Sequence, residues 1–132
     1  MGSKNNTILV VDDDHFMRES LESLLLEQGF DVVTAAEHDQ AVRILEEAAE
    51  SNEHFDVLLT DMNLPGNRSG LDLIKTVVQL KSGTVPIMIT GFGSIDGAVE
   101  AMRWGAIDYL VKPVVDRELL TAVKRAISRH AL

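Results

Sequence analysis

The hydrophobic residues of this chain fall into five short runs that are separated by longer amphipathic segments. Each run is rich in β-branched or large apolar residues, which is typical of buried strands. We therefore predict five strands, with the sequences TILVV (7–11), DVVTA (31–35), VLLT (57–60), VPIMIT (85–90) and DYLV (108–111).

The segments between and after these strands repeat their apolar residues at helical spacing. Gly29 and Gly105 stand where helix ends favour a left-handed residue, and Ser94 and Asp116 stand where helix starts favour a capping oxygen. Each helix presents one apolar stripe, which we expect to face the sheet. The stripes comprise Met17, Leu21, Leu24 and Leu25; Val42, Leu45 and Ala49; Ile74, Val77 and Val78; Ile95, Val99 and Met102; and Leu120, Val123 and Ile127.

The alternation of strands and helices predicts one α/β domain. Apolar strands joined by right-handed helical crossovers form a parallel sheet with helices on both faces. In this doubly wound class, ligands bind beyond the carboxyl ends of the strands, and the common strand order 2-1-3-4-5 makes the first and third strands neighbours. We expect residues 7–132 to form the domain, and we treat residues 1–6 as a disordered N-terminus or a tag remnant.

The overall composition narrows the classes of function. Hydrophobic residues make up 45% of the chain and charged residues 25%, as in soluble globular proteins. The formal net charge of -9 opposes direct binding to nucleic acid or to an anionic membrane, and it favours a cationic partner or a metal ion. The chain has no cysteine, which excludes disulfides and thiolate metal sites. We therefore expect a cytoplasmic protein without a membrane segment.

Polar side chains stand at the ends of four predicted strands. Asp12 and Asp13 follow the first strand, Asp61 follows the third, Thr90 ends the fourth and Lys112 follows the fifth. Each aspartate alone also fits a turn that hydrogen-bonds its own backbone. In the order 2-1-3-4-5, however, the three carboxylates crowd together. Like charges about 4 Å apart repel by roughly 4 kcal/mol at an effective dielectric of about 20, so such a cluster takes up a proton or binds a cation.

Oxygen ligands of this kind select a hard cation. Mg²⁺ accepts one or two carboxylates, keeps several waters and leaves room for a phosphoryl oxygen. Ca²⁺ is disfavoured because DDDHF (12–16) lacks the spaced ligands of a calcium loop. Thr90 can donate a hydrogen bond, and Lys112 supplies the positive charge that a phosphoryl group requires. These residues favour phosphoryl transfer onto a carboxylate, with Asp61 as the nucleophile.

Four motifs follow one another along the chain: ILVVDDD (8–14), LLTDMNLPG (58–66), IMITGFG (87–93) and YLVKP (109–113). Together they resemble the receiver domain of two-component response regulators, over about Thr7–His130. The resemblance implies a flavodoxin-like (βα)5 three-layer sandwich. It also implies a phosphoacceptor that assists its own phosphorylation and dephosphorylation, rather than an enzyme. The phosphoryl donor would be a histidine kinase or a phosphotransfer protein.

The resemblance assigns a role to each residue of the site. Asp61 becomes the phosphoacceptor, and Lys112 becomes the lysine that binds the phosphoryl group. Thr90 and Tyr109 become a switch pair that couples phosphorylation to the rest of the domain. The Mg²⁺ ligands would be Asp12, Asp13, Asp61 and the backbone carbonyl oxygen of Asn63.

The last third of the chain suggests the output of the domain. The segment SIDGAVEAMRWGAIDYLVKPVVDRELLTAVKRAI (94–127) is similar to receivers of enhancer-binding transcription activators. This similarity implies control of transcription through an effector domain outside this chain, without direct nucleic acid binding by the receiver. We expect the output surface on the fourth helix, the fifth strand and the fifth helix, and homodimerisation through that face is a hypothesis.

Two other functions stay open from the sequence. A pseudo-receiver would act only as a protein interaction module, but all five acid, hydroxyl and lysine positions are filled. A flavin or nucleotide binder is disfavoured because DDDH (12–15) stands where a phosphate loop is needed. Trp104 suits the core or an interface equally well. The four histidines share no metal-ligand spacing, and exposed helix or loop positions explain them.

Overall fold

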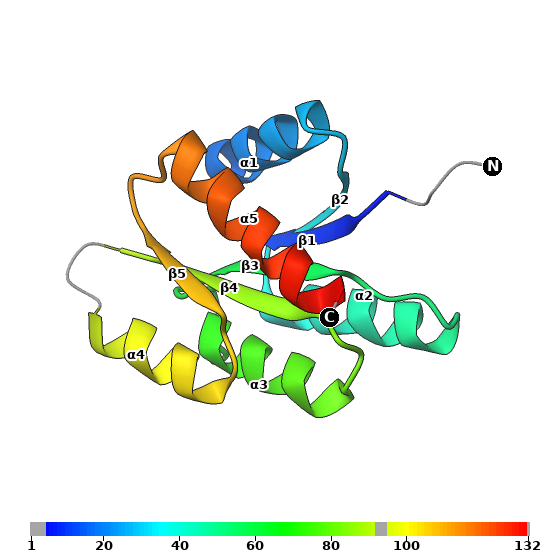
Figure 1. Ribbon diagram of the computed structural model, residues 1–132. Helices are drawn as coiled ribbons and strands as arrows, with labels where there is room; N and C mark the ends of the chain where they lie inside the picture. The colour runs from blue at the N-terminus through cyan, green and yellow to red at the C-terminus, as the bar shows by residue number, and fades with distance from the viewer. Residues whose placement is uncertain (1–4, 92–94, 132) are drawn as a thin grey trace.

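The computed structural model describes residues 5–91 and 95–131, in which strands and helices alternate (Figure 1). The strands are β1 (Thr7–Val11), β2 (Asp31–Ala35), β3 (Val57–Asp61), β4 (Val85–Thr90) and β5 (Asp108–Val111). The helices are α1 (His15–Glu27), α2 (His38–Glu50), α3 (Gly70–Leu80), α4 (Ile95–Trp104) and α5 (Asp116–Ala131). All five predicted strands are confirmed, and β3 extends by one residue to include Asp61. Asn6, which we counted with the N-terminal tail, already accepts a hydrogen bond from the N–H of Asp31.

The five strands form one parallel sheet in the order β2-β1-β3-β4-β5, which confirms the predicted topology. Helices α1 and α5 cover one face of the sheet, and α2, α3 and α4 cover the other (Figure 1). The chain therefore leaves the neighbouring strands β1 and β3 toward opposite faces, and the carboxyl ends of such a strand pair are where doubly wound proteins bind ligands. No helix in the described ranges is both long and apolar enough to cross a membrane.

The central strands supply two hydrophobic cores. Ile8 and Val10 of β1 pack with α1 and α5, whereas Leu9 and Val11 pack with α2, α3 and α4. Every residue of β3 is buried, as expected for a strand that is covered on both faces. These cores hold rigidly the two strands that carry the acidic residues.

Helix α4 packs differently from our prediction. Val99 and Met102 are 48% and 42% exposed, and Ala98 and Ala101 are buried in their place. The small alanine side chains allow α4 to lie close to the sheet, so the larger apolar side chains remain outside. The side chain of Ile95, the third member of the predicted stripe, lies outside the described residues. Two further members of predicted stripes are also exposed, Ala49 of α2 and Val78 of α3.

The helix ends follow the predicted chemistry with one correction. Gly29 and Gly105 adopt φ angles of 91° and 123°, the left-handed region that favours glycine. Asp116 is the first residue of α5 rather than the residue before it. Its carboxylate therefore lies in the first turn, where the helix dipole favours a negative charge, instead of capping the helix. The predicted cap Ser94 lies outside the described residues.

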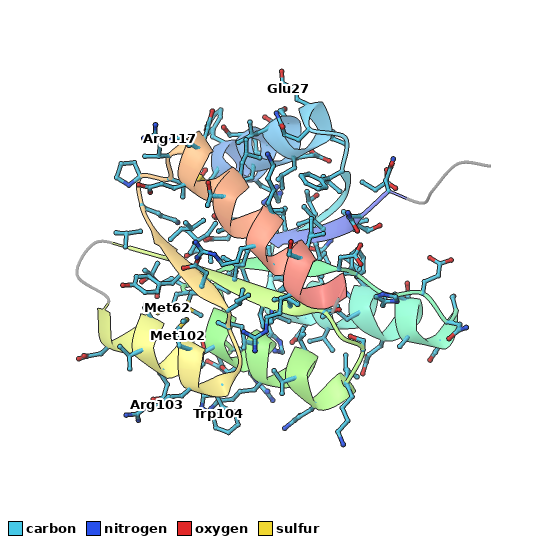
Figure 2. All side chains as sticks on the ribbon, viewed as in Figure 1. Glu27, Met62, Met102, Arg103, Trp104 and Arg117 are labelled. Carbon is cyan, nitrogen blue, oxygen red and sulfur yellow. The ribbon has the colours of Figure 1, made fainter. Side chains whose placement is uncertain are left out.

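Trp104 lies on the surface, where it joins two helices. Its side chain is 43% exposed near the end of α4 (Figure 2). The indole N–H donates to Oε1 of Glu100 at 3.2 Å, and Nζ of Lys75 on α3 lies 4.5 Å from the ring centroid. This cation–π contact ties α4 to α3. Of the two roles that we considered for Trp104, its exposure rules out the core, and the interface role stays a prediction.

His38 contradicts the expectation of an exposed histidine. It is 6% exposed, its Nδ1 lies 2.9 Å from Oδ1 of Asp39, and its Nε2 is buried without a hydrogen-bond partner among the described residues. The hydrogen bond from His38 lowers the pKa of Asp39. His38 and loop 65–68 line a cavity of 140 Å³. The imidazole therefore fills space beneath the loop that follows β3.

Candidate functional site

The turn after β1 fixes the position of Asp12. Its N–H donates to the carbonyl of Ala35 at 3.1 Å, which extends the pairing of β1 with β2. Its Oδ1 accepts a hydrogen bond from the N–H of Asp14 at 2.9 Å, and Asp14 in turn caps α1. Arg18 donates to the carbonyl of Asp12 at 2.8 Å. Asp12 is consequently buried, with 0% exposure, whereas Asp13 is exposed.

Asp61 ends β3 and is held by the strand and by the loop that follows it. It pairs with Ile89 of β4 and is 3% exposed. Its Oδ1 accepts a hydrogen bond from the N–H of Asn63 at 3.3 Å. The carbonyl of Met62 accepts a hydrogen bond from the N–H of Gly70 at 2.9 Å, so the loop folds back against the end of β3. The carboxylate of Asp61 is thereby positioned at the edge of the sheet.

The carboxylates of Asp12, Asp13 and Asp61 form one cluster, as predicted. One oxygen from each residue lies within 4.8 Å of the other two. Oδ2 of Asp12 is buried and has no hydrogen-bond partner among the described residues. Burial raises the pKa of Asp12, the hydrogen bond from Asp14 opposes this shift, and the negative charge of Asp61 adds to it. The three carboxylates therefore need compensating positive charge.

Lys112 supplies part of that charge. Its Nζ lies 2.9 Å from Oδ2 of Asp61 and 3.8 Å from Oδ2 of Asp12. Burial alone would lower the pKa of Lys112, but the hydrogen bond to Asp61 and the charges of the cluster raise it above the ordinary value. Its backbone N–H donates to the carbonyl of Thr90 at 2.9 Å, and its peptide bond to Pro113 is cis. One ammonium group beside three carboxylates leaves an excess of negative charge.

Thr90 and Tyr109 occupy different environments. Thr90 ends β4 at the same edge as the cluster and is 1% exposed. Its hydroxyl, as donor, lies 3.9 Å from Sδ of Met62 and 3.4 Å from the carbonyl oxygen of Gly91. Tyr109 lies on β5 and is 38% exposed. The structure thus brings Thr90 to the site and leaves Tyr109 on the surface, and their coupling stays a prediction.

The donor set fits a hard divalent cation. All the side-chain ligands are carboxylate oxygens, which suit Mg²⁺. Oδ2 of Asp12 is a buried oxygen without a hydrogen-bond donor among the described residues, and a cation would satisfy it. The exposed Asp13 leaves a side of the cluster open to the waters that Mg²⁺ retains. The residues present therefore fit Mg²⁺, and the carbonyl of Asn63 as a further ligand stays a prediction.

Sequence reasoning missed two residues that shape the site, Met62 and Gly70. A Cβ atom added to Gly70 would overlap the carbonyl oxygen of Asp61 and lie 3.0 Å from Cα of Met62. A glycine at the end of a polar loop was the available signal for such a close backbone approach. Met62 offered no comparable signal, since its contact with Thr90 joins the loop after β3 to the end of β4, 28 residues away in the sequence.

Known proteins contain a region that is similar in sequence to nearly the whole of this chain. Residues 8–124 match the family described as response regulator receiver domain. The chain is 37% identical over 122 residues to the transcriptional regulatory protein AruR of Pseudomonas aeruginosa, covering 92% of this chain and 49% of AruR. It is 37% identical over 124 residues to the transcriptional regulatory protein FixJ of Rhizobium meliloti, covering 94% of this chain and 57% of FixJ. The chain thus spans about half the length of these relatives.

Solved receiver structures share the fold. A response regulator receiver domain protein from Clostridium thermocellum superposes with a TM-score of 0.85 at 35% identity, covering 94% of this chain and 95% of that one. The beryllofluoride-activated receiver domain dimer of NtrC4 has a TM-score of 0.84 at 31% identity, covering 94% and 98%. Receiver domains are phosphoacceptor switches that bind Mg²⁺ at an acidic pocket and interact with histidine kinases or phosphotransfer proteins. The sequence, sheet topology and acidic cluster of this chain agree with those of receiver domains, and the chain belongs to the response regulator receiver domain family.

Proposed function

We propose that this domain accepts a phosphoryl group on Asp61 from a histidine kinase or a phosphotransfer protein. The position of Lys112 carries the proposal, because its Nζ lies 2.9 Å from Oδ2 of Asp61 and also faces Asp12. A carboxylate that is to carry a phosphoryl group needs a fixed cation beside it, and Lys112 supplies one. The phosphoacceptor role of the family supports the same assignment.

The proposed reaction is an in-line displacement at phosphorus. A carboxylate oxygen of Asp61 attacks the phosphorus atom of a phosphohistidine, the P–N bond breaks as the new P–O bond forms, and the imidazole leaves with the electron pair and takes up a proton. Lys112 remains protonated, because its pKa is raised, and it neutralises charge on the phosphoryl oxygens. The hydroxyl of Thr90 donates a hydrogen bond to one of these oxygens once it turns toward Asp61.

The residues that would hold Mg²⁺ are Asp12, Asp13, Asp61 and the backbone carbonyl of Asn63. Bound Mg²⁺ supplies further charge neutralisation for the phosphoryl oxygens. The protein contributes by fixing its ligands before the donor arrives. The hydrogen bond from Asp14 orients Asp12, and the pairing of β3 with β4 holds Asp61.

The output that we propose is control of transcription. AruR and FixJ are transcriptional regulatory proteins about twice as long as the matched region. We therefore propose that phosphorylation shifts an existing equilibrium of the receiver and acts through an effector domain outside this chain, without nucleic acid binding by the receiver itself. The pseudo-receiver alternative is not favoured, because the acidic cluster, Thr90 and Lys112 are all in place.

Incubation with acetyl phosphate and Mg²⁺ should add the mass of one phosphoryl group to the protein. Asp61→Asn should abolish this addition, because the amide has no nucleophilic carboxylate oxygen. Intact-protein mass spectrometry at low temperature measures both results. Asp31→Asn is a matched control, since it removes the same charge from an exposed position at the opposite end of the sheet. A wild-type protein that gains no mass would leave only the pseudo-receiver function.

We further propose that the α4-β5-α5 face mediates homodimerisation after phosphorylation. Large apolar side chains are exposed on these elements, which also carry exposed basic residues in a chain of net negative charge. Two of these basic side chains pair with acidic ones, Arg125 with Asp108 and Arg103 with Glu100. One matched receiver structure is a beryllofluoride-activated dimer. The exposed large apolar and basic residues of α4, β5, α5 and the loop before α5 are Val99, Met102, Trp104, Tyr109, Val111, Val115, Arg103, Arg117, Lys124 and Arg125.

Light scattering coupled to size exclusion should show the mass of two chains when beryllofluoride and Mg²⁺ are present. Val99→Asp should reduce this mass to that of one chain, because it places a charge within the apolar part of the face. Val78→Asp is a control for an equivalent change on an exposed part of α3. A mass of one chain in the presence and absence of the phosphoryl mimic would rule out the dimer.

A further inference from the structure

Met62 connects the candidate switch residue to helix α4. It directly follows Asp61, is partly buried, and packs in the core on the α2, α3 and α4 face of the sheet (Figure 2). Its Sδ lies 3.9 Å from the hydroxyl of Thr90. On its other side, a Cβ atom added to Gly97 of α4 would overlap Sδ and lie 3.0 Å from Cε. The thioether is therefore enclosed between Thr90 and the backbone of α4.

The contact with sulfur competes with the proposed role of Thr90. A threonine hydroxyl has one proton to donate, and a thioether is a weak acceptor. When the hydroxyl points to Met62, it does not donate to a phosphoryl oxygen on Asp61. The carbonyl oxygen of Gly91, 3.4 Å from the same hydroxyl, is a second acceptor. The hydroxyl must leave these acceptors before Thr90 can serve the phosphorylated site, and the weakness of the hydrogen bond to Sδ keeps the two arrangements close in free energy.

We propose that Met62 is a positioning residue that holds the hydroxyl of Thr90 in the unphosphorylated arrangement and transmits its departure to α4 through Gly97. This inference rests on the proposed role of Thr90 at a phosphorylated Asp61. Met62 touches no reacting atom in the proposed phosphoryl transfer to Asp61. It sets how readily the hydroxyl is released, and its thioether shifts against α4 when the hydroxyl leaves.

A purely structural role for Met62 predicts a different result from a positioning role. Met62→Leu keeps the apolar volume and removes the sulfur acceptor, so it separates the hydrogen bond from core packing. Loss of a weak hydrogen bond should raise the population of the released Thr90 hydroxyl by about two- to fivefold. The rate of phosphorylation by acetyl phosphate should rise by the same factor, since the released hydroxyl is the one that binds the incoming group.

The Thr90 methyl resonance in NMR spectra of the unphosphorylated protein provides a direct readout. Wild-type protein with and without beryllofluoride and Mg²⁺ defines the two end positions. Met62→Leu should move the resonance toward the beryllofluoride position. Gly97→Ala should move it in the same direction, because the added Cβ displaces the thioether, and alanine also supports the helix. Met17→Leu makes the same chemical change on the opposite face of the sheet and should leave the resonance unchanged.

An unchanged Thr90 resonance in folded Met62→Leu and Gly97→Ala would overturn the inference, whether or not the wild type accepts a phosphoryl group. An equal shift in Met17→Leu would also overturn it, because the effect would not depend on the sulfur at position 62. If the Met62 and Gly97 variants shift the resonance while the wild type gains no mass from acetyl phosphate, the positioning contact stands and the proposed function of Asp61 fails.

Discussion

Asp12→Asn should make the protein more stable and also remove the Mg²⁺ dependence of phosphorylation. The carboxylate of Asp12 is buried beside Asp61 and Asp13, with one oxygen that has no hydrogen-bond partner among the described residues. A neutral amide relieves this desolvation and repulsion, while Lys112 keeps its contact with Asp61. We expect the free energy of unfolding to rise by about 1–2 kcal/mol in metal-free buffer at neutral pH.

The stability gain should depend on pH in a defined direction. Burial raises the folded-state pKa of Asp12 above the ordinary value of 3.8. At lower pH the carboxyl group is protonated in both the folded and the unfolded state, so its burial does not reduce the free energy of unfolding. As the pH rises through 3.8 and then through the higher folded-state pKa, the wild type loses stability that the asparagine variant keeps. Urea unfolding of both proteins with a chelator, from about pH 3 to about pH 8, measures the difference. It should be smallest at acidic pH and largest at neutral pH.

Asp13→Asn is the matched control for Asp12→Asn. It removes the same charge from an exposed position in the same cluster, where solvent already screens the repulsion. The free energy of unfolding should therefore rise less than in Asp12→Asn. In Asp12→Asn, the rate of phosphorylation by acetyl phosphate should fall at least about 100-fold and lose its response to Mg²⁺. An Asp12→Asn variant that is less stable than the wild type at neutral pH would contradict the burial argument.

Gly70→Ala should lower the free energy of unfolding by about 3 kcal/mol or more. The added Cβ would overlap the carbonyl oxygen of Asp61 and crowd Cα of Met62, and both are backbone atoms that cannot rotate away. The loop after β3 would have to move, which would also break the hydrogen bond from Gly70 to the carbonyl of Met62. Any folded fraction should therefore phosphorylate more slowly, because Asp61 loses its position.

Gly91→Ala gives the comparison for Gly70→Ala. Among the described residues, no atom lies within 4 Å of a Cβ atom added to Gly91, so this change should alter stability by no more than about 0.5 kcal/mol. Chemical denaturation of both variants measures the contrast. Equal stability of the two variants would show that the loop after β3 can move to accommodate the added Cβ atom without a loss of stability. The close approach of Gly70 to the backbone of Asp61 and Met62 would then not be what requires a glycine at this position.

The strands and the acidic cluster followed from the sequence because both depend on local pattern. Short β-branched runs between helical segments fixed the five strands, and the doubly wound topology then required Asp12, Asp13 and Asp61 to meet. Lys112 followed in the same way, since it leaves β5 at the same edge of the sheet. These predictions needed the direction of each strand and no detail of side-chain packing.

The sequence was misleading where size and distant contacts decide the packing. The periodicity of α4 favoured Val99 and Met102 as core residues, but close approach to the sheet selected Ala98 and Ala101. His38 was counted as polar and exposed, yet its ring fills space beneath a loop more than twenty residues away in the sequence. Contacts of this kind join elements that no local pattern relates to one another.

The cation–π contact of Trp104 gives this protein an intrinsic optical reporter. Trp104 is the only tryptophan of the chain, and the ammonium group of Lys75 lies over its ring. We therefore expect its fluorescence emission to respond to the distance between α3 and α4 without any added dye. A stopped-flow trace of that emission would follow the movement of α4 in real time.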